Sequence, residues 1–393
     1  MKKYIFPLFL GGISLGLTEF VMMGILPQLS QSLKITIPEA GHLISIYALG
    51  VVVGSPLLVI FSNKFSPKSI LIFLAAFIAI SNSLSALSTN YHLMLLVRFL
   101  SGLPHGAFFG IGAIVAIKLS PKGKGSAAIA MMFAGLTVAN LMMVPVGTSI
   151  AIHFSWHYVF LMVGLLGFFT VMSVVYFIPN IDKLETKGLK EDLKLFKKLD
   201  IWVSLAIVSF GCGGMFAWYS YIAPLMIHVT KISEIYIPYI MALTGFGMLM
   251  GVIVGGKISD RLDPIKSTIY LLIGLIGCLL MVYFFSQFKI ISLMLTFLTG
   301  AFAFALASPI QMILINTFKG SEMLGSALAQ SGFNIANALG AFLGGLPLAY
   351  HYSYKSPEVP AIGIAILGML LVIFLGQLKK NHSLNSQELV ESY

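Results

Sequence analysis

Twelve long apolar segments divide the chain, and short polar stretches separate them. A membrane-spanning helix needs about 20 mostly apolar residues, and each of these segments reaches that length. Inside lipid, a single segment can satisfy its backbone hydrogen bonds only as a helix. The pattern therefore predicts twelve transmembrane helices, at residues 5–29, 42–61, 69–88, 92–117, 126–150, 157–178, 201–228, 236–258, 267–287, 290–317, 323–349 and 358–378.

The composition fits a lipid-facing surface. Hydrophobic residues make up 58% of the 393 positions and charged residues only 10%, with a mean hydropathy of +0.96. A soluble domain carries about 25% charged residues, so this chain lacks the charge for a water-facing surface. We expect an all-α membrane protein.

The net charge of +10 raises the question of nucleic acid binding. The aromatic residues lie inside apolar segments and are not interleaved with Lys and Arg, as a nucleic acid surface would require. The two cysteines, Cys212 and Cys278, also fall in apolar segments, which is typical of small core residues. The sequence therefore favours neither a nucleic acid partner nor a metal site.

Lysine and arginine are distributed unequally between the two sets of loops. If the N-terminus is cytoplasmic, 19 of these 24 residues fall in cytoplasmic segments, 4 fall outside, and Arg98 is embedded in a helix. Cytoplasmic loops of membrane proteins are enriched in Lys and Arg. With an even number of spans, the asymmetry predicts that both termini are cytoplasmic.

A charged stretch at residues 179–200 separates the first six segments from the last six. Leu189, Leu193 and Phe196 recur there at helical spacing, which predicts an amphipathic surface helix. We expect this stretch to link two pseudo-symmetric six-helix bundles, so that the chain comprises residues 1–178, the linker 179–200, residues 201–378 and a cytoplasmic tail at 379–393.

The two sets share a loop pattern after their second helix. Residues 61–68 and 258–266 both combine a polar or acidic residue, a cation and a Pro–Lys element. Internal repetition is typical of secondary transporters, whose substrate site lies between the repeats.

These loops resemble the major facilitator superfamily, whose motif there is Gly-x-Leu-Ala-Asp-Arg-x-Gly-Arg-Lys. The second loop keeps Gly256, Asp260 and Arg261, whereas the first has Asn63 and Lys64 at the Asp and Arg positions. In the family this loop helps to latch the outward-facing state, so the resemblance implies such a role for these residues.

Further strings resemble the drug:proton antiporter branch of that family, which includes bacterial arabinose-efflux permeases. They lie at residues 17–24, 47–54, 98–110, 137–140, 144–147 and 333–340, with Val144 where a glycine is typical of antiporters. The resemblance implies a monomer of the bacterial inner membrane that exports arabinose-like sugars or small amphipathic drugs. The sequence has no ATP-binding motif, so we expect no cofactor and a proton gradient as energy source.

Glu19 is the one carboxylate that the pattern places deep in a helix. The other acidic residues, Glu358 included, are expected in loops, the linker or the tail. An ionisable residue at membrane depth is a candidate functional site. Two roles remain open for Glu19, namely proton coupling and a structural hydrogen bond that fixes the first helix.

Arg98 and His105 lie two turns apart on one face of the fourth helix. Arg98 falls at a depth similar to that of Glu19, so the two side chains are able to pair. It has either a folding role through that pair or the role in proton transfer that the resemblance implies. A histidine titrates near physiological pH, which suits a proton relay, although a hydrogen bond from His105 to a backbone carbonyl explains it nearly as well.

Uncharged polar and aromatic residues are candidates for a substrate cavity. The amides Gln330, Asn334 and Asn337 share one face of the eleventh helix. Hydrogen bonds between helices are the alternative explanation for each candidate. The remaining candidates are Tyr47, Asn140, Trp218, Tyr219 and Gln311.

The sequence therefore predicts a secondary transporter in the lipid bilayer. It is expected to move a small-molecule substrate and protons by alternating access. A proton-independent facilitator or importer on the same fold is the nearest alternative. An intramembrane enzyme and a sensor without transport are weaker ones, because an enzyme needs several converging catalytic groups and only one histidine and one carboxylate are embedded.

Overall fold

The computed structural model describes residues 3–62, 65–121, 124–182, 199–318 and 322–391. Within these ranges every regular element is a helix, and twelve helical stretches are long and apolar enough to cross a membrane. The predicted all-α architecture with twelve spans is therefore confirmed. The proposed amphipathic helix around Leu189, Leu193 and Phe196 lies outside the described residues.

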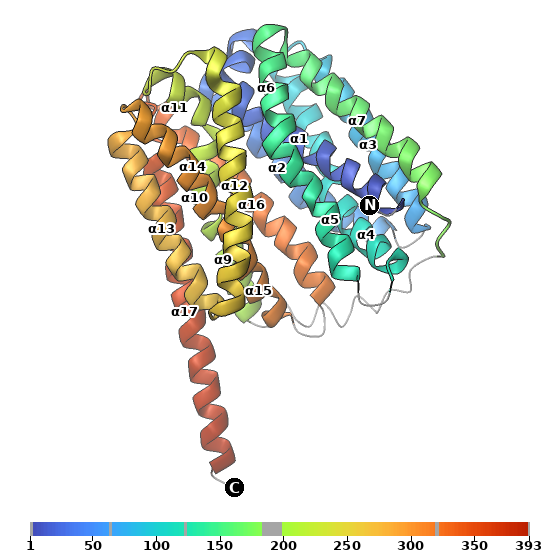
Figure 1. The fold of residues 1–393 in the computed structure, drawn as a ribbon, viewed down its shortest axis with the longest axis vertical. Helices are drawn as coiled ribbons and strands as arrows, with labels where there is room; N and C mark the ends of the chain where they lie inside the picture. Colours follow the sequence, from blue (N-terminus) through green and yellow to red (C-terminus); the bar gives the residue numbers. More distant parts are fainter. Residues whose placement is uncertain (1–2, 63–64, 122–123, 183–198, 319–321, 392–393) are drawn as a thin grey trace.

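The first half contains six spans (Figure 1). Its fifth span contains one turn of π-helix, η1, between two α-helices. The elements are α1 (Ile5–Leu33), α2 (Ile37–Ser62), α3 (Pro67–Ala86), α4 (Tyr91–Leu119), α5 (Gly125–Val138), η1 (Ala139–Met143), α6 (Val144–His153) and α7 (Trp156–Phe177).

The second half also contains six spans, and its first and fourth spans are interrupted. The last helix continues beyond the expected end of its span, through the predicted tail. The elements are α9 (Leu199–Gly211), α10 (Gly213–Ser220), α11 (Ile222–His228), η2 (Glu234–Tyr236), α12 (Ile237–Arg261), α13 (Pro264–Phe285), α14 (Lys289–Ala305), α15 (Ala307–Thr317), α16 (Glu322–Ala349) and α17 (Glu358–Glu391).

Proline explains why three predicted helices are not uniform. Pro145, Pro224 and Pro309 each lie in the first turn of a new segment, namely α6, α11 and α15. Proline has no N–H to donate to the preceding turn, but the first turn of a helix does not need that bond. A new segment therefore begins just before each of these prolines.

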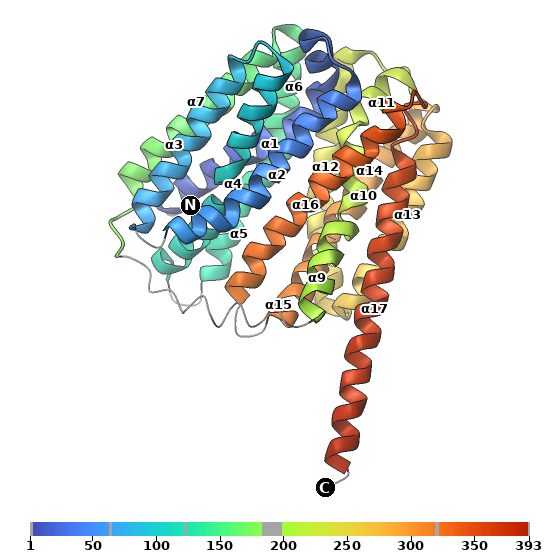
Figure 2. The ribbon, with the colours of Figure 1, turned by 180° about the vertical axis from the view of Figure 1, so that it is seen from behind.

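The two halves meet at one end of the bundle. We call this the distal end, where α1 ends and α2 begins, and the opposite end, where α1 begins and α17 leaves the bundle, the terminal end (Figures 1 and 2). At and near the distal end α2 packs against α16, α6 against α12, and α1 against α11. One hydrogen bond across this contact runs from Ser45 Oγ to the carbonyl oxygen of Ala338, at 3.0 Å.

The buried apolar side chains form two clusters. The larger cluster joins both halves and includes Phe20 of α1 and Phe216 of α10, whose rings stack with centroids 6.4 Å apart. The smaller cluster contains only first-half residues near the terminal end, such as Leu8, Val115 and Met132. The halves therefore share a core towards the distal end, whereas the first half has a separate core at the terminal end.

Close helix contacts repeat in the two halves. In the first half, α2 touches α4 at Gly54, where a Cβ would lie 2.2 Å from the carbonyl oxygen of Leu103. In the second half, α12 touches α14 at Gly251, where a Cβ would lie 2.1 Å from the carbonyl oxygen of Ala301. Small residues allow such close approach of helix backbones in membranes. The equivalent contacts support the pseudo-symmetry that the repeated loops predicted.

We predict that Gly54→Ala destabilises the protein. The added methyl group would clash with the backbone of α4, and overpacking of this kind costs about 1–3 kcal/mol. The midpoint of thermal unfolding in detergent should fall. Gly363→Ala in α17 is the matched control, because its Cβ would meet nothing within 4 Å, and it should leave the midpoint unchanged or raise it. Equal midpoints for the two variants would contradict the packing argument.

Candidate functional site

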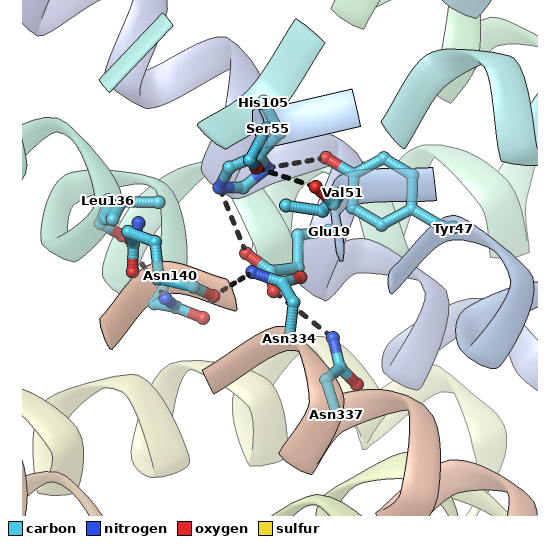
Figure 3. A network of polar contacts seen from close by, with 10 residues as sticks. Glu19, Tyr47, Val51, Ser55, His105, Leu136, Asn140, Asn334 and Asn337 are labelled. Carbon is cyan, nitrogen blue, oxygen red and sulfur yellow. Dashed lines mark hydrogen bonds and ion pairs between the residues drawn. The ribbon is translucent and has the colours of Figure 1, made fainter. Parts of the chain in front are cut away.

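Glu19 lies in the middle of α1, at the contact between the two halves (Figure 3). Its side chain is buried, with 2% of the residue exposed. The amide of Asn337, from α16 in the second half, donates a hydrogen bond of 3.1 Å to Glu19 Oε1. On the other side, His105 Nε2 of α4 lies 3.9 Å from Glu19 Oε2. One carboxylate therefore contacts both halves of the protein.

His105 connects this carboxylate to α2. Its Nδ1 lies 2.8 Å from the hydroxyl of Tyr47, within hydrogen-bond distance. The sequence suggested Tyr47 for the substrate cavity, but the structure places it in the cluster around Glu19. The groups Tyr47, His105, Glu19 and Asn337 thus form one row of polar contacts across α2, α4, α1 and α16. Carboxyl, imidazole and phenol groups in such a row can bind and pass protons.

Arg98 is fully buried beside this row. Its Nη1 donates to Thr18 Oγ1 at 3.0 Å, and its Nε donates to the carbonyl oxygen of Leu43 at 3.4 Å. The guanidinium carbon lies 4.2 Å from the centre of the Tyr47 ring, a cation–π arrangement. Nη2 has no hydrogen-bond partner among the described residues.

The structure does not pair Arg98 with Glu19, although their depths would allow it. Within the described residues, the one ion-pair contact of Glu19 is with His105. Successive residues of an α-helix point about 100° apart. Thr18 therefore faces Arg98 on α4, whereas Glu19 turns towards His105 and the second half. The sequence left this pairing open, and in the structure the two side chains contact different partners.

Two other amide candidates, Asn140 and Asn334, lie near Glu19 without bonding to it (Figure 3). Asn140 lies in η1 and Asn334 one turn before Asn337, and both are buried. Each amide nitrogen donates to the carbonyl four residues earlier, and each Oδ1 lacks a partner among the described residues. These oxygens are therefore buried hydrogen-bond acceptors without a partner. A π-turn such as η1 frequently marks a functional site.

The remaining candidates are more dispersed. Trp218 and Tyr219 are fully buried in α10, and the ring of Tyr219 lies 6.3 Å from that of Phe20 in α1. Gln311 in α15 and Gln330 in α16 are half-buried, and no contact in the described structure joins either side chain to Glu19.

The structure describes only part of the proposed latch. Gly256, Asp260 and Arg261 lie in the last two turns of α12, and both charged residues are exposed. Neither forms a salt bridge with another described residue. Asn63 and Lys64 lie outside the described residues.

Sequence reasoning missed two polar residues that hold Arg98 in place. Thr18 Oγ1 accepts from Arg98 and donates to Asn82 Oδ1 of α3 at 2.5 Å. The Asn82 amide in turn donates to the carbonyl of Ile78. Asn82 is the one carboxamide of α3, where it stands among serines near the end of the helix, and that signal could have identified it.

Glu358 is a second buried carboxylate, and the expectation that it lies in a loop was wrong. It begins α17 with 1% of the residue exposed. Loops between spans are short here, so a polar residue at a helix start can still be covered by neighbouring helices. Its position in the first turn of α17 suits the helix dipole, which stabilises negative charge there.

The described residues contain no group of three or more His, Cys, Asp or Glu side chains that could hold a metal ion. The side chains of the polar row can bind protons and form hydrogen bonds.

We predict that Thr18→Val destabilises the protein, because it leaves the buried Arg98 guanidinium and Asn82 without their shared partner. An unpaired buried polar group costs about 1–3 kcal/mol, and more where the group is charged. The thermal unfolding midpoint should fall in Thr18→Val and stay near wild type in Thr18→Ser, which keeps the hydroxyl. Equal loss in both variants would show that the hydroxyl does not hold Arg98.

Comparison with known proteins places the chain in a family. The sequence profile of the Major Facilitator Superfamily matches residues 8–329. "Putative transporter AraJ" of Escherichia coli (strain K12) is 39% identical over 392 residues, which cover 100% of this chain and 99% of that protein. A "Probable sugar efflux transporter" of Pasteurella multocida (strain Pm70) is 24% identical over 95% of this chain and 92% of its own length.

The fold comparison agrees. The crystal structure of a bacterial homologue of the human lysosomal transporter Spinster, in an inward-facing and unoccupied conformation, has a TM-score of 0.76 to this chain. The alignment covers 95% of this chain and 96% of that one, at 13% sequence identity. The chain is a multi-pass membrane transporter, and it belongs to the Major Facilitator Superfamily.

Proposed function

We propose that this transporter is a proton-coupled antiporter that exports small molecules by alternating access. The observation that carries the proposal is the position of Glu19. Its carboxylate contacts His105 in the first half and Asn337 in the second half. A proton that binds or leaves Glu19 changes the charge at the contact between the halves, and this links protonation to the movement of one half against the other.

The structure fits one state of such a cycle, with the halves packed together at and near the distal end. The excess of Lys and Arg in the terminal-end loops supports a cytoplasmic location for that end and for both termini. In this proposal the substrate enters from the cytoplasm and leaves on the distal side. Glu19 takes a proton from the distal side and releases it to the cytoplasm.

The polar groups around Glu19 support sugars as substrates. The free amide oxygens of Asn140 and Asn334 are acceptors for hydroxyl groups, and the Tyr219 hydroxyl is buried without a partner among the described residues. Aromatic rings such as Tyr219 and Phe20 offer a stacking surface for a sugar ring. Small amphipathic drugs also suit a mixed amide and aromatic surface. We further propose a monomer located in the bacterial inner membrane.

We predict that Glu19→Gln abolishes proton-driven export. Glutamine keeps the size and the hydrogen-bond acceptor for Asn337 but cannot exchange a proton at neutral pH. The measurement is export by inverted vesicles or proteoliposomes under an imposed pH gradient, with the purified variant checked for folding. Proton-driven export at the wild-type rate in the folded variant would refute the role of Glu19.

Net export measured with and without a proton gradient separates antiport from facilitation. An antiporter with a coupled carboxylate should move little net substrate when the gradient is collapsed. Net export that is equally fast with and without the gradient would favour a proton-independent facilitator on the same fold.

We predict that locking the distal end stops transport. In a background of Cys212→Ala and Cys278→Ala, the pair Ser45→Cys and Ala338→Cys should form a disulfide, because the Ser45 hydroxyl already reaches the Ala338 backbone. Oxidation should abolish transport, and reduction should restore it.

The matched control for this lock joins two helices of the same half. Ser14 Oγ of α1 donates to the carbonyl of Val163 in α7 at 3.3 Å, so the pair Ser14→Cys and Val163→Cys tests the effect of a bond within one half. Undiminished transport by the locked distal pair would contradict alternating access.

A further inference from the structure

A polar cavity of about 290 Å³ lies at the distal end, separate from the site around Glu19. Its walls come from the last turns of α1, the end of α6, the start of α7, and η2. Gln28, on its wall, is nine residues after Glu19, which corresponds to about 13 Å along α1. The cavity is lined by both halves, because η2 contributes Glu234 and the rest of the wall belongs to the first half.

Two buried polar atoms on this wall have no partner. Trp156 is 3% exposed, and its Nε1 donor has no hydrogen-bond partner among the described residues. The Oε1 acceptor of Gln28 is buried in the same way. The Trp156 ring is held between His157, which stacks at a centroid distance of 3.6 Å, and Phe160. Its N–H is therefore fixed in direction and not free to find a partner by rotation.

The charge of the wall defines the ligand further. Glu234 is the one charged residue of the lining, and its carboxylate is exposed. It favours a cation and disfavours an anion. Of the remaining polar side chains of the wall, Gln31 and Ser32 can both donate and accept hydrogen bonds, whereas the Ser155 hydroxyl already bonds to His157. A hydroxyl-bearing ligand suits them, and a hydroxyl oxygen can accept from Trp156.

The volume sets the size of the ligand. Water occupies about 30 Å³ per molecule in the liquid, so the cavity has room for about ten water-sized groups. This is the size of a single sugar ring with its substituents.

We propose that this cavity is a binding site for a small hydroxylated amine, whose ammonium group faces Glu234 and whose hydroxyl groups meet Gln28 and Trp156. Such a ligand contacts both halves at the end where they are packed together. Its occupancy therefore stabilises the closed distal end. The cavity wall does not include Glu19, so the site is distinct from the proposed proton-coupling site.

The test measures binding of radiolabelled glucosamine to the purified full chain in lipid nanodiscs. Glucosamine carries both an ammonium group and hydroxyl groups. We expect saturable binding that Glu234→Gln weakens about fivefold, the upper end for an exposed ion pair. Trp156→Phe should weaken it by a similar factor, since one buried hydrogen bond is lost. Glucose, which lacks the ammonium group, should compete about fivefold less well.

Two variants serve as controls. Glu39→Gln removes another distal carboxylate, which binds Thr36 and lies outside the cavity wall, and it should bind glucosamine as the wild type does. Gly363→Ala in α17, where the added Cβ would meet nothing within 4 Å and which lies outside the cavity wall, should also retain binding. All variants are compared with the wild type for monodispersity and thermal unfolding midpoint before binding is measured.

Three outcomes would overturn the proposal. The first is absence of saturable binding, which means that the cavity holds solvent only. The second is wild-type binding in both Glu234→Gln and Trp156→Phe. The third is a loss of binding in Glu39→Gln as large as that in Glu234→Gln, which would show that the effect is not specific to the cavity wall.

Discussion

The hydrogen bond from Asn337 to Glu19 is the contact on which the arrangement of the site depends. It joins α16 of the second half to α1 of the first at the middle of the bundle. A buried carboxylate requires hydrogen-bond partners, and Glu19 obtains one from the opposite half. Contacts between the halves continue from this level towards the distal end, at Asn140 with Gly245 and at Ser45 with Ala338. The carboxylate therefore lies where the shared core of the two halves begins.

The hydrophobic pattern was sufficient to predict the spans but not their internal breaks. The pattern around Pro224 and Pro309 is continuous in hydropathy, and hydropathy does not report the loss of a backbone donor. Pro27, Pro56 and Pro104 lie inside helices that continue. The choice between a break and a continuous helix depends on neighbouring helices that can satisfy the freed carbonyls, and a single sequence does not contain that information.

The sequence identified Glu19, Arg98 and His105 as candidates, because an ionisable residue inside an apolar span can be recognised from the sequence alone. It did not identify which of them meet. Consecutive side chains of α1 point about 100° apart. Thr18 therefore accepts a hydrogen bond from Arg98, whereas Glu19 contacts His105. The sequence did not identify Glu358 as a buried carboxylate, because it does not lie inside an apolar span. It stands at the edge of a span, where the sequence does not distinguish a covered helix start from an exposed loop.

The separate apolar cluster of the first half has a consequence for biosynthesis. Its side chains come from α1, α3, α4, α5 and α7, and none comes from the second half. Domains generally fold as units, with the N-terminal one first, during synthesis. The first half can therefore complete this core while the second half is still being made. The hydrogen bond from Asn337 to Glu19 can form only after α16 has been inserted. The order of synthesis thus makes the contact between Glu19 and Asn337 one of the last to form.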